Sequence, residues 1–244
     1  HGSLWIGLDP GGLVRMREGR VERYFPADGP PVGAVASLFE DVEGLIWVGT
    51  TGDGVHRLAT TEAVAVPVTG DVRGSPVLPV VGDGGAGLWV GLYCGGLVHL
   101  DADRRTVYDE GDGLVSGCVG ALLRDDDGTL WVGTTGGGLH RMQAGRLLAL
   151  GGPDTPERAV RALHRSRDRS LLVGTDAGVF RWRGESGGFE PVPGASGLDV
   201  YRLAEDPSGG VWVGTLNGVR VLGPGGATVP PGAESGAGAP VREE

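Results

Sequence analysis

Short apolar runs recur along the chain at nearly constant intervals. Each run has five residues, carries Trp or Leu at its second position, and is followed by a Gly-rich turn or loop. The six runs are LWIGL (4–8), IWVGT (46–50), LWVGL (88–92), LWVGT (130–134), LLVGT (171–175) and VWVGT (211–215). The second positions, Trp5, Trp47, Trp89, Trp131, Leu172 and Trp212, are spaced 42, 42, 42, 41 and 40 residues apart. A period this regular indicates a repeat architecture.

Each repeat is predicted to form four short strands. An apolar stretch such as VASLFED (35–41) comes first, and a tight turn with Asp and Gly leads to the Trp run. A strand such as GVHRL (54–58) and a weaker segment such as GRLLAL (145–150) complete the repeat. The Trp runs are apolar on both faces, which is typical of strands covered on both sides. Radially stacked four-stranded sheets give that burial. We therefore predict an all-β fold, a β-propeller of six four-stranded blades of about 41 residues, over residues 1–229.

The two ends of the chain decide how such a ring could close. The first repeat begins at the turn before Trp5, so its innermost strand is missing. Residues 230–244 form a tail rich in Gly, Ala and Pro. Joined in a circle, APVREE (239–244) and HGSLWIG resemble SLFEDVEGLIWVG, so residues 239–244 could complete the first blade. The alternative is that the tail is a linker and the chain is part of a larger propeller.

The repeat unit resembles a known family. The pattern Asp-x-x-Gly-x-Leu-Trp-Val-Gly-Thr runs from Asp125 to Thr134, and Gly-Leu-x-Arg follows at 138–141. The lead-in GLVSGCVGAL (113–122) fits the same pattern. These features resemble the two-component regulator propeller repeat. Three departures occur: Leu172 replaces a Trp, Leu92 replaces a Thr, and Asp168-Arg169-Ser170 stands where Asp-Gly is expected.

The resemblance implies a function. Such propellers are extracytoplasmic sensor regions, periplasmic or extracellular, of bacterial signal-transduction proteins of the histidine kinase or diguanylate cyclase type. They bind a small ligand, often a carbohydrate, or mediate dimerisation, and an output domain is attached in the full-length chain. We accordingly expect a binding module without cofactor, not an enzyme. Two alternatives stay open: a streptogramin-lyase-like propeller enzyme, for which the inner strands offer His164 as a base, and a pure protein-interaction ring.

Charge limits the partners. The chain of 244 residues has 21 basic and 31 acidic side chains, which gives a net charge of −10. This balance argues against nucleic acid, whose phosphates require a basic face, and against an anionic membrane surface. The apolar stretches are also too short to span a bilayer. We expect neither nucleic acid nor membrane contact for this segment.

Two candidate metal sites were weighed and rejected. Asp125, Asp127 and Gly128 suggest a calcium loop, but the loop would need acids where Leu123 and Thr134 stand. Asp and Gly suit a tight turn, which is the preferred interpretation of this segment. His56, His140 and His99 fall on the third strands of different repeats, where they cannot converge on one ion. We expect no metal site, and we expect the Arg residues of these strands to partner turn acids or carbonyls.

The best candidate site lies where the loops entering each inner strand meet the loops that follow each Trp strand. Loops of this kind usually carry recognition. Four residues break the repeat there: Tyr93, Arg161, Asp199 and Tyr201. Asp53, Asp176 and Asn217 follow Trp strands on the same face. Aromatic rings beside directed polar groups suit sugars or peptides. The alternative is that these are ordinary rim residues.

The two cysteines fall in the same kind of connection. Cys94 follows the third Trp strand and Cys118 precedes the inner strand of the next repeat. Adjacent blades could bring the thiols together, and an extracytoplasmic location would then permit a disulfide. Because Cα atoms more than about 7 Å apart cannot be bridged, two separate thiols are the preferred interpretation, and a Cys94–Cys118 disulfide is the alternative.

Overall fold

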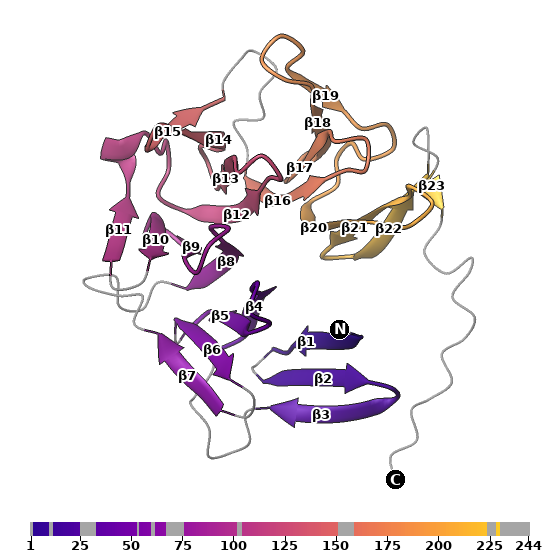
Figure 1. Ribbon diagram of the computed structural model, residues 1–244. Helices are drawn as coiled ribbons and strands as arrows, with labels where there is room; N and C mark the ends of the chain where they lie inside the picture. The colour runs from indigo at the N-terminus through magenta and orange to yellow at the C-terminus, as the bar shows by residue number, and fades with distance from the viewer. Residues whose placement is uncertain are drawn as a thin grey trace. The chain divides into compact units, whose positions relative to one another are not determined.

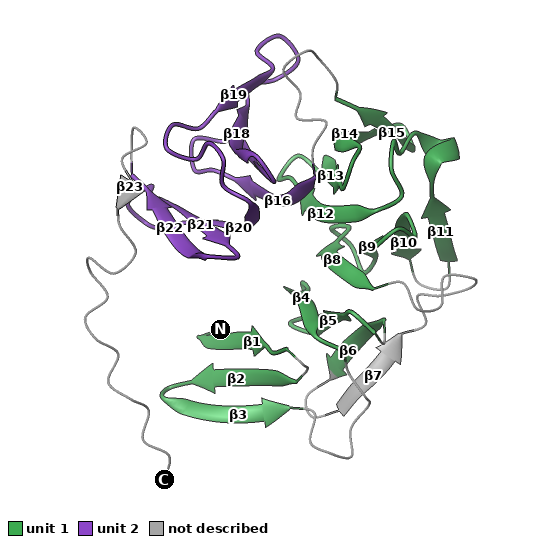
Figure 2. Ribbon diagram, turned by 180° about the vertical axis from the view of Figure 1, so that it is seen from behind, with its two compact units in different colours: residues 1–151 green, residues 152–244 purple. Residues whose placement is uncertain are grey.

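Six antiparallel sheets follow one another along the chain (Figure 1). The structure is a computed structural model, and it describes residues 2–9, 12–24, 33–52, 54–59, 62–66, 76–101, 104–150, 159–223 and 228–229. In these ranges the helical structure amounts to one 3-10 turn, Glu110–Asp112, and no helix there has the length and apolar character needed to cross a membrane. The chain divides into two compact units, residues 1–151 and 152–244 (Figure 2).

The first unit contains four sheets, and in each one the strands pair in chain order. The first sheet has three strands, β1 (Ser3–Gly7), β2 (Leu13–Arg17) and β3 (Arg20–Tyr24). The second comprises β4 (Val35–Glu40), β5 (Ile46–Thr50), β6 (Val55–Ala59) and β7 (Glu62–Val66). The third comprises β8 (Val77–Gly82), β9 (Leu88–Leu92), β10 (Leu97–Asp101) and β11 (Arg104–Tyr108). The fourth comprises β12 (Val119–Arg124), β13 (Leu130–Thr134), β14 (Gly138–Gln143) and β15 (Arg146–Ala149).

The second unit contains two four-stranded sheets of the same kind. The fifth sheet comprises β16 (Val160–Arg165), β17 (Leu171–Thr175), β18 (Gly178–Trp182) and β19 (Phe189–Pro191). The sixth comprises β20 (Val200–Glu205), β21 (Val211–Thr215), β22 (Gly218–Leu222) and β23 (Thr228–Val229). One sheet per repeat, with the Trp run as its second strand, is the arrangement that the repeat predicts. Residues 239–244 lie outside the described residues, so their role in the first blade stays a prediction.

The second strands β5, β13 and β17 are buried on both faces, as their uniform apolar sequence predicts. Trp47 and Trp131 are 8% and 6% exposed, and Val48 and Val132 on the opposite face are fully buried. The glycine of the run permits this packing. A Cβ atom on Gly174 would lie 2.6 Å from Cγ1 of Val200 and 3.0 Å from Cβ of Ala162. Any larger residue at this position would therefore push neighbouring strands apart.

In three sheets, an aspartate holds the turn before the Trp strand through its side-chain oxygens. Asp41 Oδ1 accepts hydrogen bonds from the backbone N–H groups of Glu43 and Leu45, both at 2.9 Å. Its Oδ2 accepts a bond of 2.7 Å from the indole N–H of Trp47. The same carboxylate–indole bond recurs at Asp125–Trp131, 3.1 Å, and Asp206–Trp212, 3.0 Å. These Asp residues therefore have a structural role in the turns, as the sequence predicts.

The third sheet uses a histidine for the same purpose. His99 Nε2 lies 2.9 Å from Asp83 Oδ2, and its ring stacks on Trp89 with centroids 4.1 Å apart. Burial alone would raise the pKa of Asp83, but hydrogen bonds from His99, Gly85 and Gly87 outweigh it and lower the pKa. In the sixth sheet, bonds from Ser208 and then Trp212 lower the pKa of Asp206. The turn carboxylates of these two sheets are therefore stabilised as anions.

The Arg column of the third strands has two kinds of partner. Arg181 pairs with the turn acid Asp168, with Nη1 and Oδ2 2.6 Å apart, which matches the expected role. Arg15 and Arg57 instead lie over indole rings, with Cζ 5.3 Å and 5.9 Å from the ring centroids of the Trp residues opposite them. The register explains the difference, because the residue opposite Arg181 is Leu172, which offers no aromatic face.

His140 is a structural core residue. It lies on β14 and is fully buried. Its Nε2 accepts a hydrogen bond of 3.1 Å from the backbone N–H of Val115. Burial lowers the pKa of His140, so the ring is neutral in the folded protein and can accept this bond. His56 occupies the equivalent place on β6 and is also fully buried.

Candidate functional site

A β-bulge occurs near the start of the first strand in five sheets. In four of them the pairing skips one residue, and in the third sheet it skips two. The skipped residues are Ala36 in β4, Leu78 and Pro79 in β8, Gly120 in β12, Arg161 in β16 and Tyr201 in β20. A bulge interrupts the regular strand pairing and re-aims the side chain of its extra residue. The bulge is thus a constant of the scaffold, while the residue it presents varies.

Two of these bulges present side chains that contact each other. The guanidinium carbon of Arg161 lies 4.8 Å from the ring centroid of Tyr201. Arg161 Nη1 also donates to Oδ1 of Asp199, the residue directly before β20. Beneath the three side chains, Val160 and Val200 are fully buried. The backbone that carries the site is therefore fixed by core residues.

The cluster is accessible to solvent, and the charges of Arg161 and Asp199 balance each other. The Arg161 side chain is 27% exposed and that of Asp199 is 42% exposed. Tyr201 is half-buried. The arrangement offers donors on a guanidinium, acceptors on a carboxylate and a rigid aromatic edge at one place. Such a combination can orient a polar ligand of small size.

The structure describes three further predicted site residues. Tyr93 belongs to the first unit, where it follows β9 and is 49% exposed. Asp176 and Asn217 are exposed in the turns after β17 and β21. Asp53 lies outside the described residues. Within the second unit, the structure joins three of the predicted ligand-binding residues by direct contacts: Arg161, Asp199 and Tyr201.

Cys94 and Cys118 form a disulfide. The structure therefore differs from the preferred interpretation of two separate thiols. The reason is that backbone bonds draw their loops together, because Gly96 N–H donates to Gly117 O at 2.8 Å. A second bond of 2.8 Å, from Thr135 N–H to Cys118 O, fixes the same loop to the end of β13. The two Cα atoms are 3.7 Å apart, below the limit of about 7 Å beyond which they could not be bridged.

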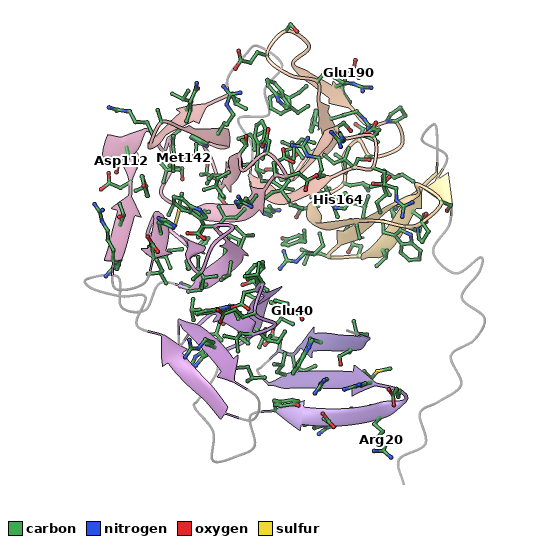
Figure 3. The ribbon with its side chains drawn as sticks, in the orientation of Figure 1. Arg20, Glu40, Asp112, Met142, His164 and Glu190 are labelled. Carbon is green, nitrogen blue, oxygen red and sulfur yellow. A yellow bond between two sulfur atoms is a disulfide. The ribbon has the colours of Figure 1, made fainter. Side chains whose placement is uncertain are left out.

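A second polar cluster lies at the other end of β16 and β20. His164 Nε2, on β16 (Figure 3), is 3.5 Å from Glu205 Oε2. Ser166 Oγ and the backbone N–H of Arg167 donate to the same oxygen, at 3.0 and 2.9 Å. Sequence reasoning missed Glu205. The signal was available, because Ser166 stands where four other repeats have the turn aspartate.

Within the described ranges, no three His, Cys, Asp or Glu side chains are grouped so that they could hold a metal ion.

Comparisons with known proteins agree on the fold. The extracellular domain assigned to the hybrid two component system BT3049 of B. thetaiotaomicron is 20% identical, with a TM-score of 0.75 over 91% of this chain and 32% of that one. A streptogramin B lyase is 14% identical, with a TM-score of 0.76 over 93% of this chain and 78% of that one. The virginiamycin B lyase of Staphylococcus aureus is 13% identical, with a TM-score of 0.69 over 93% and 83%. At these identities the likeness concerns the fold. The chain spans about a third of the length of the Bacteroides domain.

The six sheets and these likenesses define the protein as an all-β β-propeller, as the repeat predicts. The family described as "Two component regulator propeller" matches residues 113–136 and 194–217. These two segments match repeats of this family, which confirms the resemblance drawn from the sequence. No curated protein matches the sequence.

Proposed function

We propose that this propeller is the extracytoplasmic sensor region of a bacterial signal-transduction protein, and that its ligand binds at Arg161, Asp199 and Tyr201. The contact among these three side chains is the observation that carries the proposal. The family match and the fold shared with the extracellular domain of a two component system support the sensor role. A periplasmic or extracellular location and an attached histidine kinase or diguanylate cyclase output domain follow from this role.

The chemistry of the cluster favours a neutral, carbohydrate-like ligand. The charge of Arg161 is balanced by Asp199, so the pair presents directed donors and acceptors without a net charge. Sugar hydroxyls both donate and accept, and so they match such a pair, while the Tyr201 ring supplies apolar contact. An anionic ligand would have to approach the Asp199 carboxylate and a chain of net charge −10.

Isothermal titration against a defined panel tests the proposal. The panel contains neutral gluco-, manno- and xylo-oligosaccharides and, as the anionic counterpart, oligogalacturonates. We expect at least one neutral oligosaccharide to bind, and Tyr201→Ala to weaken it roughly tenfold or more, a loss typical of a central aromatic contact. Arg183→Ala, which removes an exposed ion pair with Glu190 on the same unit, serves as the matched control. An affinity that Tyr201→Ala leaves unchanged, or a preference for oligogalacturonates, would refute the proposal.

Signalling adds a requirement to binding. A ligand passes a signal only if it stabilises one arrangement of the sensor over another. In the full-length protein, the ligand identified above should change the activity of the output domain, and Tyr201→Ala should shift the response to higher ligand concentration. An output that does not change with ligand would leave a binding module without a sensor role.

An enzyme of the streptogramin-lyase type is the second candidate. It is favoured by the fold shared with two lyases and by the contact of His164 with Glu205. Because Glu205 is 7% exposed and its Oε2 already accepts two hydrogen bonds, a base role would fall to His164. Incubation with a streptogramin B depsipeptide tests this candidate, since opening of the ring that is lost in His164→Ala would support it.

A further inference from the structure

The fifth repeat departs from the others at two positions that normally act together. Where other turns pair an aspartate with a Trp six residues later, this turn has Ser166 and Leu172. Leu172 has no side-chain N–H group. An aspartate at position 166 would therefore find no indole from which to accept a hydrogen bond. Asp168 holds this turn from within, because its Oδ1 accepts from the backbone N–H and the Oγ of Ser170 at 2.9 and 2.6 Å. At position 166 itself, a second fastening stands in place of the aspartate.

The fastening comes from the neighbouring sheet. Glu205, the last residue of β20, accepts from Ser166 Oγ and from the backbone N–H of Arg167. Arg167 Nη1 in turn donates to Pro207 O at 2.9 Å. These bonds satisfy a carboxylate that is 7% exposed and would be costly to bury without partners. An aspartate at position 166 would place a second negative charge against Glu205.

The same two strands carry the proposed ligand site at their opposite ends. Arg161 is the second residue of β16, and Tyr201 is the second residue of β20. Between the two ends, Ala162 and Val200 belong to one apolar cluster, against which Leu203 packs. Glu205 follows Tyr201 by four positions of extended chain, about 13 Å. Any effect of Glu205 on the site must therefore pass through the placement of the strands.

We infer that Glu205 is a positioning residue: it replaces the missing turn aspartate from the adjacent sheet, and so sets the spacing of β16 and β20 on which the Arg161–Tyr201 contact depends. Hydrogen bonds at the Glu205 end and the Arg161–Asp199 pair at the other end hold the two strands in one register. The inference builds on the proposed ligand site by naming what preorganises it.

The test needs no ligand, so its failure can be told apart from a failure of ligand binding. A proton above an aromatic ring is shifted upfield, and the shift of the Arg161 side-chain signals relative to a Tyr201→Leu variant measures the contact by NMR. Glu205→Ala should lose more than half of this shift. Glu205→Gln retains an acceptor oxygen for Ser166 and Arg167, and should preserve the shift.

Glu40→Ala provides the matched control, because Glu40 is the last residue of β4 and belongs to the other unit. It should leave the shift unchanged. A full shift in Glu205→Ala, even with a lowered melting temperature, would reduce Glu205 to a merely stabilising residue and overturn the inference. If Glu205→Ala does not fold, Ser166→Asp repels Glu205 and should weaken the shift, and an unchanged shift in that variant would equally overturn it.

Discussion

Arg161 and Tyr201 occupy the same structural position in two consecutive sheets, since each is the extra residue of a β-bulge. Their side chains are in contact, with Cζ of Arg161 4.8 Å from the ring centroid of Tyr201. The equivalent positions in other sheets hold small or apolar residues such as Ala36 and Gly120. A bulge residue stands outside the regular register of its strand pair, so it can change without altering that register. This separates the side chains available for recognition from those that hold the scaffold.

Removal of a buried indole should destabilise the protein strongly. Trp131→Ala deletes a side chain that is 6% exposed and bonded to Asp125, and we expect a loss of about 3–5 kcal/mol in the free energy of unfolding. Trp212 makes the same bond to Asp206 but is 46% exposed, so Trp212→Ala should cost less than about 2 kcal/mol. Denaturant unfolding measures both. Equal losses would show that burial is not what distinguishes them.

Removal of the disulfide should lower stability without changing the fold. The bridge joins residues 24 apart, and the loop-entropy model assigns about 3 kcal/mol to a ring of this size. Cys94→Ser combined with Cys118→Ser should show this loss in denaturant unfolding. Thiol titration of the unreduced protein in denaturant checks the bridge itself: we expect no free thiol, and two free thiols would contradict it.

The stability of the protein should depend on the protonation of His140. Its pKa is lowered in the folded state by burial, so the unfolded state binds the proton more readily. The stabilising contribution is therefore complete above the unfolded pKa of about 6.5 and is lost as the pH falls below it, by up to about 1.4 kcal/mol per pH unit. Unfolding measured from pH 7.5 to 5 should show this slope in the parent protein and a smaller slope in His140→Val. Identical slopes would exclude His140 as its source.

The sequence predicts most of the scaffold because six repeats show the same pattern, so each strand and turn can be inferred from six copies. Runs such as IWVGT (46–50) become second strands buried on both faces, and the turn aspartates are scaffold. Repetition also exposes Arg161 and Tyr201 as exceptions. The bulge beneath them was not foreseen, because a one-residue register shift leaves no mark on a short strand whose apolar pattern is already irregular.

Two further features could not be derived from single repeats. Glu205 acts on the turn of the preceding sheet, and such a contact between repeats has no periodicity to reveal it. The disulfide depends on how closely two loops approach, which is set by backbone bonds such as Gly96 to Gly117. The family of the repeats was readable from the motif at 125–134, whereas the choice of ligand depends on side-chain geometry.

Deletion of residues 239–244 tests the proposed completion of the first sheet. The described part of this sheet has three strands, and Leu4 and Ile6 on β1 are 57% and 37% exposed, whereas the equivalent Ile46 and Val48 are buried. If residues 239–244 supply the missing strand, their removal should lower the melting temperature by several degrees, as a loss of 1 kcal/mol or more would do. Removal of 230–235 instead shortens the tail and serves as the control. An unchanged melting temperature after deletion of 239–244 would reject the idea.

Mapping of the bound ligand by NMR tests the central claim most directly. The neutral oligosaccharide that binds most tightly in the titration panel is added to the isotopically labelled protein, and backbone and side-chain shifts are followed. The proposed site predicts the largest changes at Arg161, Asp199 and Tyr201, and their loss in Tyr201→Ala at the same ligand concentration. Changes confined to the opposite ends of the strands, around turn residues such as Asp168 and Asp206, would contradict it.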